Sequence, residues 1–80
     1  MLAKRLKRPA MAVWLELVAN IVAEAPITLD AAFERGCVAM GVEATHYQTE
    51  RFRRVVDLLE TRCKIVVERQ AGQPVLLKNI

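Results

Sequence analysis

A short segment of the sequence, Thr45–Val56, gathers the side chains best suited to bind a phosphate group or the edge of a base. It reads THYQTERFRRVV and holds three arginines, a tyrosine, a glutamine and the single histidine of the chain. Arginine donates paired hydrogen bonds to guanine or to phosphate, and glutamine pairs with adenine. Two interpretations are open, a surface that contacts nucleic acid or the solvated side of an ordinary helix.

Helical spacing separates the inner from the outer side chains of this segment. Apolar residues recur at three- and four-residue steps and predict a buried stripe, which consists of Phe52, Val55, Val56 and Leu59. The polar residues that remain outside, or near the edge, are the candidate nucleic-acid-binding set of this helix: His46, Tyr47, Gln48, Arg51, Arg53 and Arg54. Tyr47, Arg51 and Arg54 share one stripe, and Glu50 within the same surface would repel phosphate.

Two further groups are candidates for contact with a polyanion. The first eight residues carry four cations and no acid, namely Lys4, Arg5, Lys7 and Arg8. As an arm, they would bind backbone phosphates or follow a groove. A predicted turn offers Arg69, Gln70 and Gln73, which would reach a minor groove or the backbone. The alternatives are a basic cap on the first helix and a plain turn.

Catalytic and metal-binding chemistry has little support in the sequence. Gly36, Gly41 and Gly72 are scattered, whereas a phosphate-binding loop needs closely spaced glycines. His46 lies outside any recognised catalytic motif, and the acidic residues fit solvated ion pairs. One histidine and two separated cysteines do not complete a zinc site. We therefore expect no enzymatic activity, no cofactor and no metal.

Length and composition bound the fold. A chain of 80 residues, 54% hydrophobic and 26% charged, predicts one globular domain over 1–80. Its net charge of +3 mildly favours polyanionic partners. Cys37 and Cys63 are far apart in the sequence, so two free thiols in a reducing compartment are the simplest interpretation. A disulfide between them is the less favoured alternative.

The N-terminal sequence imitates a secretory signal, with a basic octet at 1–8, an apolar run and small residues after it. Glu16 and Asn20 interrupt that run. A membrane-spanning helix needs about 20 apolar residues, so the run is too short and too polar to cross a bilayer. We expect a cytoplasmic protein without a membrane segment.

Prolines, glycines and capping residues predict the first two helices. Pro9 opens a helix over residues 10–25, and Pro26 ends it because proline lacks a donor and restricts its predecessor. Thr28 is a suitable N-cap for the second helix, and Gly41 is a suitable C-terminal stop.

A third helix and a hairpin follow. Thr45 caps the helix with Gln48 placed as in a capping box, and the helix is expected to end near Arg62. From Lys64 the pattern changes, because KIVVER and PVLLKNI are apolar runs of strand length that flank a QAGQ turn. This predicts a β-hairpin, with Pro74 starting an edge strand.

The order helix, helix, short turn, helix, hairpin resembles the winged helix-turn-helix domain over about residues 9–80. The resemblance rests on element order and length. The short strand usual between the first two helices is expected at 25–28, with Ile27 as its single pairing residue. The resemblance implies an α+β fold, a three-helix core with a C-terminal hairpin wing, and a recognition helix at about 45–62.

The expected function is that of a small DNA-binding protein that regulates transcription, with double-stranded DNA as its partner. The first helix is apolar over more than one face, which predicts a homodimer through the region of Trp14. The alternative is a protein-interaction module, such as an adaptor, subunit or inhibitor of a complex that handles nucleic acid.

Overall fold

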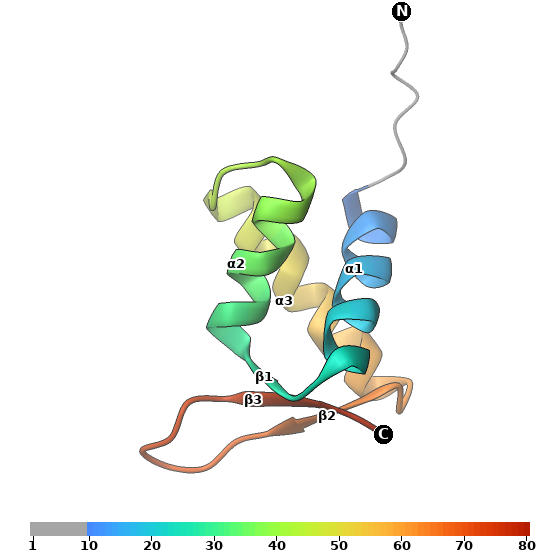
Figure 1. Ribbon diagram of the computed structural model, residues 1–80, viewed down its shortest axis with the longest axis vertical. Coiled ribbons are helices and arrows are strands. Elements are labelled where there is room, and N and C mark those ends of the chain that lie inside the picture. Colours follow the sequence, from blue (N-terminus) through green and yellow to red (C-terminus); the bar gives the residue numbers. More distant parts are fainter. Residues whose placement is uncertain (1–9) are drawn as a thin grey trace, which may run out of the picture.

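Three helices lie on one side of a small antiparallel sheet in the computed structural model, which describes residues 10–80 (Figure 1). The helices are α1 (Ala10–Glu24), α2 (Leu29–Met40) and α3 (His46–Thr61). The strands are β1 (Ile27–Thr28), β2 (Ile65–Glu68) and β3 (Leu76–Asn79). The predicted α+β class and the C-terminal hairpin are confirmed, and the arrangement is compatible with a winged-helix-like fold.

The start and end of α2 follow the predicted capping chemistry. The hydroxyl oxygen of Thr28 accepts a hydrogen bond from Ala31 N at 3.2 Å. At the other end Gly41 takes the left-handed conformation, with φ of 69°, and its N–H bonds to Val38 O at 3.1 Å. Glycine adopts this conformation without the strain that a Cβ would impose, so the helix ends there.

The start of α3 differs in one respect from the predicted capping box. Thr45 Oγ1 accepts a hydrogen bond from Gln48 N at 3.3 Å, as predicted. The backbone N–H of Thr45, however, donates to Glu43 O at 2.8 Å, and the Gln48 side chain accepts a hydrogen bond from Trp14. The reciprocal bond of the capping box is therefore a wrong prediction, because a buried indole N–H takes the Gln48 oxygen.

The sheet places its strands in the order β1-β3-β2, all antiparallel. Leu77 pairs with Ile27 on one side and with Val67 on the other, so the predicted pairing of Ile27 is confirmed. Ile27 is not the single pairing residue, because Thr28 pairs with Leu76. The expectation for Pro74 is wrong, since β3 begins at Leu76 and is the central strand. A proline has no N–H for a strand bonded on both sides, and Pro74 accordingly lies between the turn and β3.

Aromatic rings from three helices meet in the core. The ring of Trp14 lies 5.7 Å from that of Phe33 and 5.3 Å from that of Phe52, between ring centroids. Aromatic pairs at these separations add to the burial of their apolar area. All four residues of the stripe predicted for α3 are buried, namely Phe52, Val55, Val56 and Leu59. The core thus fixes which side of α3 faces outward.

Both cysteines are free, as predicted, with Cys37 buried and Cys63 exposed. Within residues 10–80, no helix has the length and apolar character needed to cross a bilayer.

Candidate nucleic-acid interface

The outer side of α3 carries most of the candidate residues. His46, Tyr47, Arg53 and Arg54 are exposed, and Arg51 and Gln48 are half-buried. The four basic residues from the N-terminal octet, Lys4, Arg5, Lys7 and Arg8, lie outside the described residues. The remaining candidates, Arg69, Gln70 and Gln73, are exposed on the β2–β3 hairpin, which we call the wing.

Tyr47 and Arg51 form a stacked pair one helical turn apart. The guanidinium carbon of Arg51 lies 4.9 Å from the centroid of the Tyr47 ring. A cation–π contact of this kind contributes about 0.5–1 kcal/mol at an exposed site. A guanidinium group above an aromatic ring still has N–H donors that can bind a phosphate or a base.

Gln48 lies half-buried at one edge of the outer side of α3, and its side chain is bonded to the core. Its Oε1 accepts a hydrogen bond of 2.9 Å from Nε1 of Trp14, whose side chain is fully buried. A buried indole N–H needs an acceptor, and Gln48 supplies it from the first turn of α3. The sequence carried one signal for this contact, namely the single tryptophan of the chain, whose indole N–H needs an acceptor when the ring is buried.

One edge of α3 faces the N-terminal half of α1. Gln48 contacts Trp14 at one end of this edge, and Leu58 and Arg54 line a shallow hollow with Met11 at the other. Arg51 lies between Gln48 and Arg54 at three-residue steps. Tyr47, Arg51 and Arg54 therefore form a row beside α1, which we call the arginine row.

The opposite edge of α3 faces the wing. Arg53 lines a small pocket together with Arg69 of the wing. Nη1 of Arg69 lies 3.4 Å from Oε2 of Glu60, so this cation has a carboxylate partner on α3. Asp57 borders both this pocket and the hollow on the α1 side, and lies between the two edges. The structure thus separates Arg53 from its sequence neighbour Arg54.

The tip of the wing is a tight turn. Gln73 N donates to Gln70 O at 3.0 Å, and Gly72 has a φ of 77°. The side chains of Gln70 and Gln73 are exposed, and the tip projects away from the helices in Figure 1.

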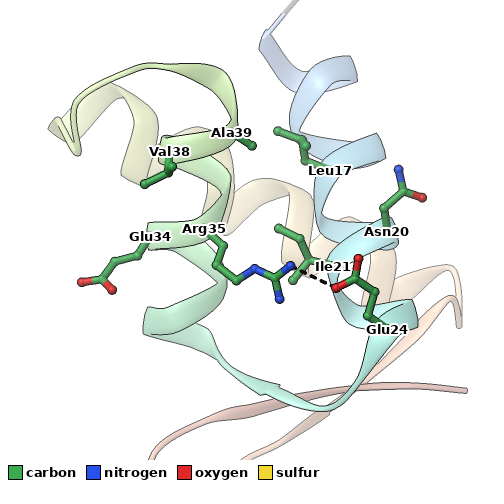
Figure 2. Close-up of a pocket in the computed structure, with 8 residues that line it drawn as sticks. All are labelled: Leu17, Asn20, Ile21, Glu24, Glu34, Arg35, Val38 and Ala39. Carbon is green, nitrogen blue, oxygen red and sulfur yellow. Dashed lines mark hydrogen bonds and ion pairs between the residues drawn. The ribbon is translucent and has the colours of Figure 1, made fainter.

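A second surface lies between α1 and α2, where a groove has a volume of about 500 Å³ (Figure 2). Leu17 and Ile21 of α1 and Val38 of α2 supply apolar lining, and an ion pair between Arg35 and Glu24 spans the groove at 3.0 Å. Val38 is 81% exposed at the border of this groove, which leaves its apolar side chain accessible to a partner.

Trp14 does not belong to this surface. It has no exposed area, because Phe33, Phe52 and α2 enclose it. Trp14 itself is therefore part of the core. The homodimer expected through α1 stays a prediction, and its contact would involve the groove side of the helix.

The described residues 10–80 contain no cluster of three His, Cys, Asp or Glu side chains arranged to hold a metal ion. Comparisons with protein-family models, with curated proteins and with solved structures find no match for the chain.

Proposed function

We propose that the chain is a small winged-helix DNA-binding protein that regulates transcription, with α3 as its recognition helix. The observation that carries the proposal is the outward cluster of Arg51, Arg53 and Arg54 on α3. Among residues 10–80 the ion pairs belong to Arg35, Arg69 and Lys78, so these three arginines have no carboxylate partner there. Unpaired guanidinium groups on an exposed helix are available to phosphates and to guanine edges.

Geometry supports the same proposal. The turn between α2 and α3 is short, spanning residues 41–45, and the core fixes α3 through Phe52 and Val55 with its polar side outward. A helix held in this way presents its N-terminal half to the major groove in helix-turn-helix proteins. Tyr47 and Arg51 lie in that half and are already stacked, which reduces the ordering required on binding.

The direct test is fluorescence anisotropy of the full chain titrated onto labelled random duplex DNA across a salt series. We expect micromolar or tighter dissociation constants at low salt, and an affinity that falls steeply with salt, because each neutralised phosphate adds about 0.9 to the slope of log K against log salt. Absence of binding at about 50 mM salt contradicts the proposal.

A second candidate function is a protein-interaction module, such as an adaptor, subunit or inhibitor of a complex that handles nucleic acid. The observation that favours it is the groove between α1 and α2, with exposed Val38 at its border. Apolar anchors in such grooves bind the apolar side of a partner helix. Co-purification of a stoichiometric partner that Val38→Glu abolishes and Arg54→Gln leaves intact would establish this function.

A further inference from the structure

The strand β2 has one edge that pairs with no other strand. The sheet order is β1-β3-β2, so β2 bonds to β3 on one side and forms the margin of the sheet on the other. We call this margin the free edge of β2. Among residues 10–80 no backbone hydrogen bond joins it to another segment. The N–H and C=O groups of such an edge are available to a further strand.

The register of the sheet identifies the backbone groups on the free edge. Leu29 N donates to Val75 O at 2.8 Å, which makes these two residues a hydrogen-bonded pair at the end of the β1–β3 ladder. Backbone groups alternate sides along an antiparallel strand, so the even-numbered residues of β3 direct theirs to β2. The even-numbered residues of β2 lie opposite them. Ile65 and Val67 therefore direct their N–H and C=O groups outward at the free edge.

The side chains along β2 alternate between the core and the outer face of the sheet. Ile65 is buried in the core and Val67 packs against it, whereas Val66 is exposed. By the same alternation, Lys64 just before the strand and Glu68 at its end share the outer face with Val66. The outer face of this segment thus carries a cation, a valine and a carboxylate in that order.

This order is self-complementary in an antiparallel pair. When two copies of β2 lie antiparallel with Val66 opposite Val66, Lys64 of each copy lies opposite Glu68 of the other, where opposite charges stabilise the pair. In the same register Ile65 lies opposite Val67 of the other copy, so the outward backbone groups of both copies meet. A slip of one residue sets outward groups against inward ones, and a slip of two removes both Lys–Glu pairs.

We propose that the free edge of β2 binds the same edge of a second copy of the chain, antiparallel and with Val66 at the two-fold axis, so that the two sheets become one. Lys64 has no carboxylate partner among residues 10–80. Glu68 lies 2.8 Å from Lys78 of its own chain, so Lys64 of the second copy would complete a ladder of alternating charge.

This contact is separate from the other surfaces of the molecule. No residue of the sheet lines the groove between α1 and α2, and the contact does not depend on DNA binding. It is made by backbone groups and buries few apolar side chains, so we expect it to be weaker than a contact through the apolar groove. A covalent trap detects an association of this kind.

The test is disulfide trapping under mild oxidation, in a V38E/C63S background that removes the groove contact and the exposed native thiol. Residues opposite each other in a non-hydrogen-bonded antiparallel pair have Cα atoms about 4.5 Å apart, within the range of about 4.4–6.8 Å that a disulfide spans. We therefore expect V66C to form a covalent dimer. K64C or E68C alone should form none, because the offset separates like positions by about 13 Å. A mixture of K64C and E68C should form the cross-linked dimer.

A charge exchange tests the ion pairs in the same assay, with circular dichroism as a check on folding. Adding K64E to V66C turns both Lys–Glu pairs into like-charge pairs and is expected to lower the trapped fraction about tenfold. Adding E68K as well restores opposite charges and should restore trapping. Absence of a V66C dimer, equal yields from V66C, K64C and E68C as in random collision, or a yield insensitive to both charge changes would each overturn the proposal.

Discussion

The core requires a glycine at position 36, because a side chain there would collide with Trp14. A Cβ built at this position overlaps Cζ3 of Trp14 and lies 2.7 Å from its Cη2. The indole is fully buried and fixed by its hydrogen bond to Gln48, so it has little room to move away. The glycine therefore allows α1 and α2 to approach closely around the tryptophan, at the cost of its low helix propensity.

Gly36→Ala is accordingly expected to destabilise the fold, although alanine is the better helix former. Overpacking against a rigid ring costs about 1–3 kcal/mol, which exceeds the gain in propensity of about 1 kcal/mol. Urea unfolding followed by circular dichroism measures the change. In a Trp14→Leu background the same substitution is expected to be neutral or stabilising, and equal destabilisation in both backgrounds would contradict the steric explanation.

The hydrogen bond between Trp14 and Gln48 leads to a second prediction about stability. Gln48→Leu removes the acceptor of a buried indole N–H, and an unsatisfied buried donor costs about 1–3 kcal/mol. Thermal unfolding of Gln48→Leu should show this loss, whereas Gln48→Glu keeps an acceptor oxygen and should be affected less. If the two variants are equally stable, the bond does not contribute in the way the geometry indicates.

The two cysteines are expected to differ sharply in reactivity. Burial raises the pKa of the Cys37 thiol above its ordinary value of 9.0, while Cys63 is exposed. Because thiolate is the reactive form, a disulfide reagent should label Cys63 quickly in the folded protein and Cys37 only after unfolding. The Cys63→Ser variant provides the control, since its folded form should react slowly.

The raised pKa also gives a pH dependence. At a pH below the ordinary pKa of the thiol, both the folded and the unfolded states hold the thiol proton, and this group does not change the stability. Above that value the unfolded state loses its proton first, so the stability falls as the pH rises, and Cys37→Ala should remove this part of the loss.

At the level of the elements, the start of α3 matters most because the proposed contact lies there. Thr45 Oγ1 is the acceptor for Gln48 N, and Thr49 Oγ1 donates to Thr45 O at 3.0 Å. Thr45→Ala is expected to cost about 1 kcal/mol of stability, the usual value of an N-cap, whereas Thr45→Ser should cost little. Denaturant titration distinguishes the two, and a Ser variant as unstable as the Ala variant would point to lost packing of the methyl group.

The sequence predicted the elements well where local chemistry decides them. Caps at Thr28 and Thr45 and the stop at Gly41 gave helix boundaries close to those observed, and a three-to-four-residue step gave the buried stripe of α3. The expectation that Pro74 starts an edge strand was wrong, because the sequence of a hairpin does not reveal which of its two strands pairs with a third strand. That choice depends on how β1 packs against β3, which is a contact between distant parts of the chain.

The candidate site was predictable only in part, for a related reason. Helical spacing placed Tyr47 and Arg51 on one stripe, and the structure shows them stacked. The same reasoning did not predict the hydrogen bond between Gln48 and Trp14, because spacing within one helix carries no information on a residue of another helix. Similarly, the pairing of Arg69 with Glu60 depends on how the wing folds back toward α3.

At the scale of the whole molecule, the groove between α1 and α2 leads to a prediction about oligomeric state. We expect a homodimer whose contact uses the groove between α1 and α2, because Val38 is exposed there while Trp14 is enclosed. Sedimentation velocity over a range of concentrations should show a dimer that Val38→Glu converts to a monomer. Ala23→Glu, on an exposed position of α1 away from the groove lining, is the matched control. A monomer at all concentrations would contradict the dimer.

The central position of β3 determines what would happen if the chain were cleaved in the wing. The wing tip, after Arg69, is exposed, and β3 on its far side is held by pairing with β1 and β2 and by the buried side chain of Leu77. A cut at Arg69 would leave a peptide of residues 70–80 bound without covalent attachment. We therefore expect fragment complementation: the peptide 70–80, added separately to fragment 1–69, should pair as β3 and restore the fold.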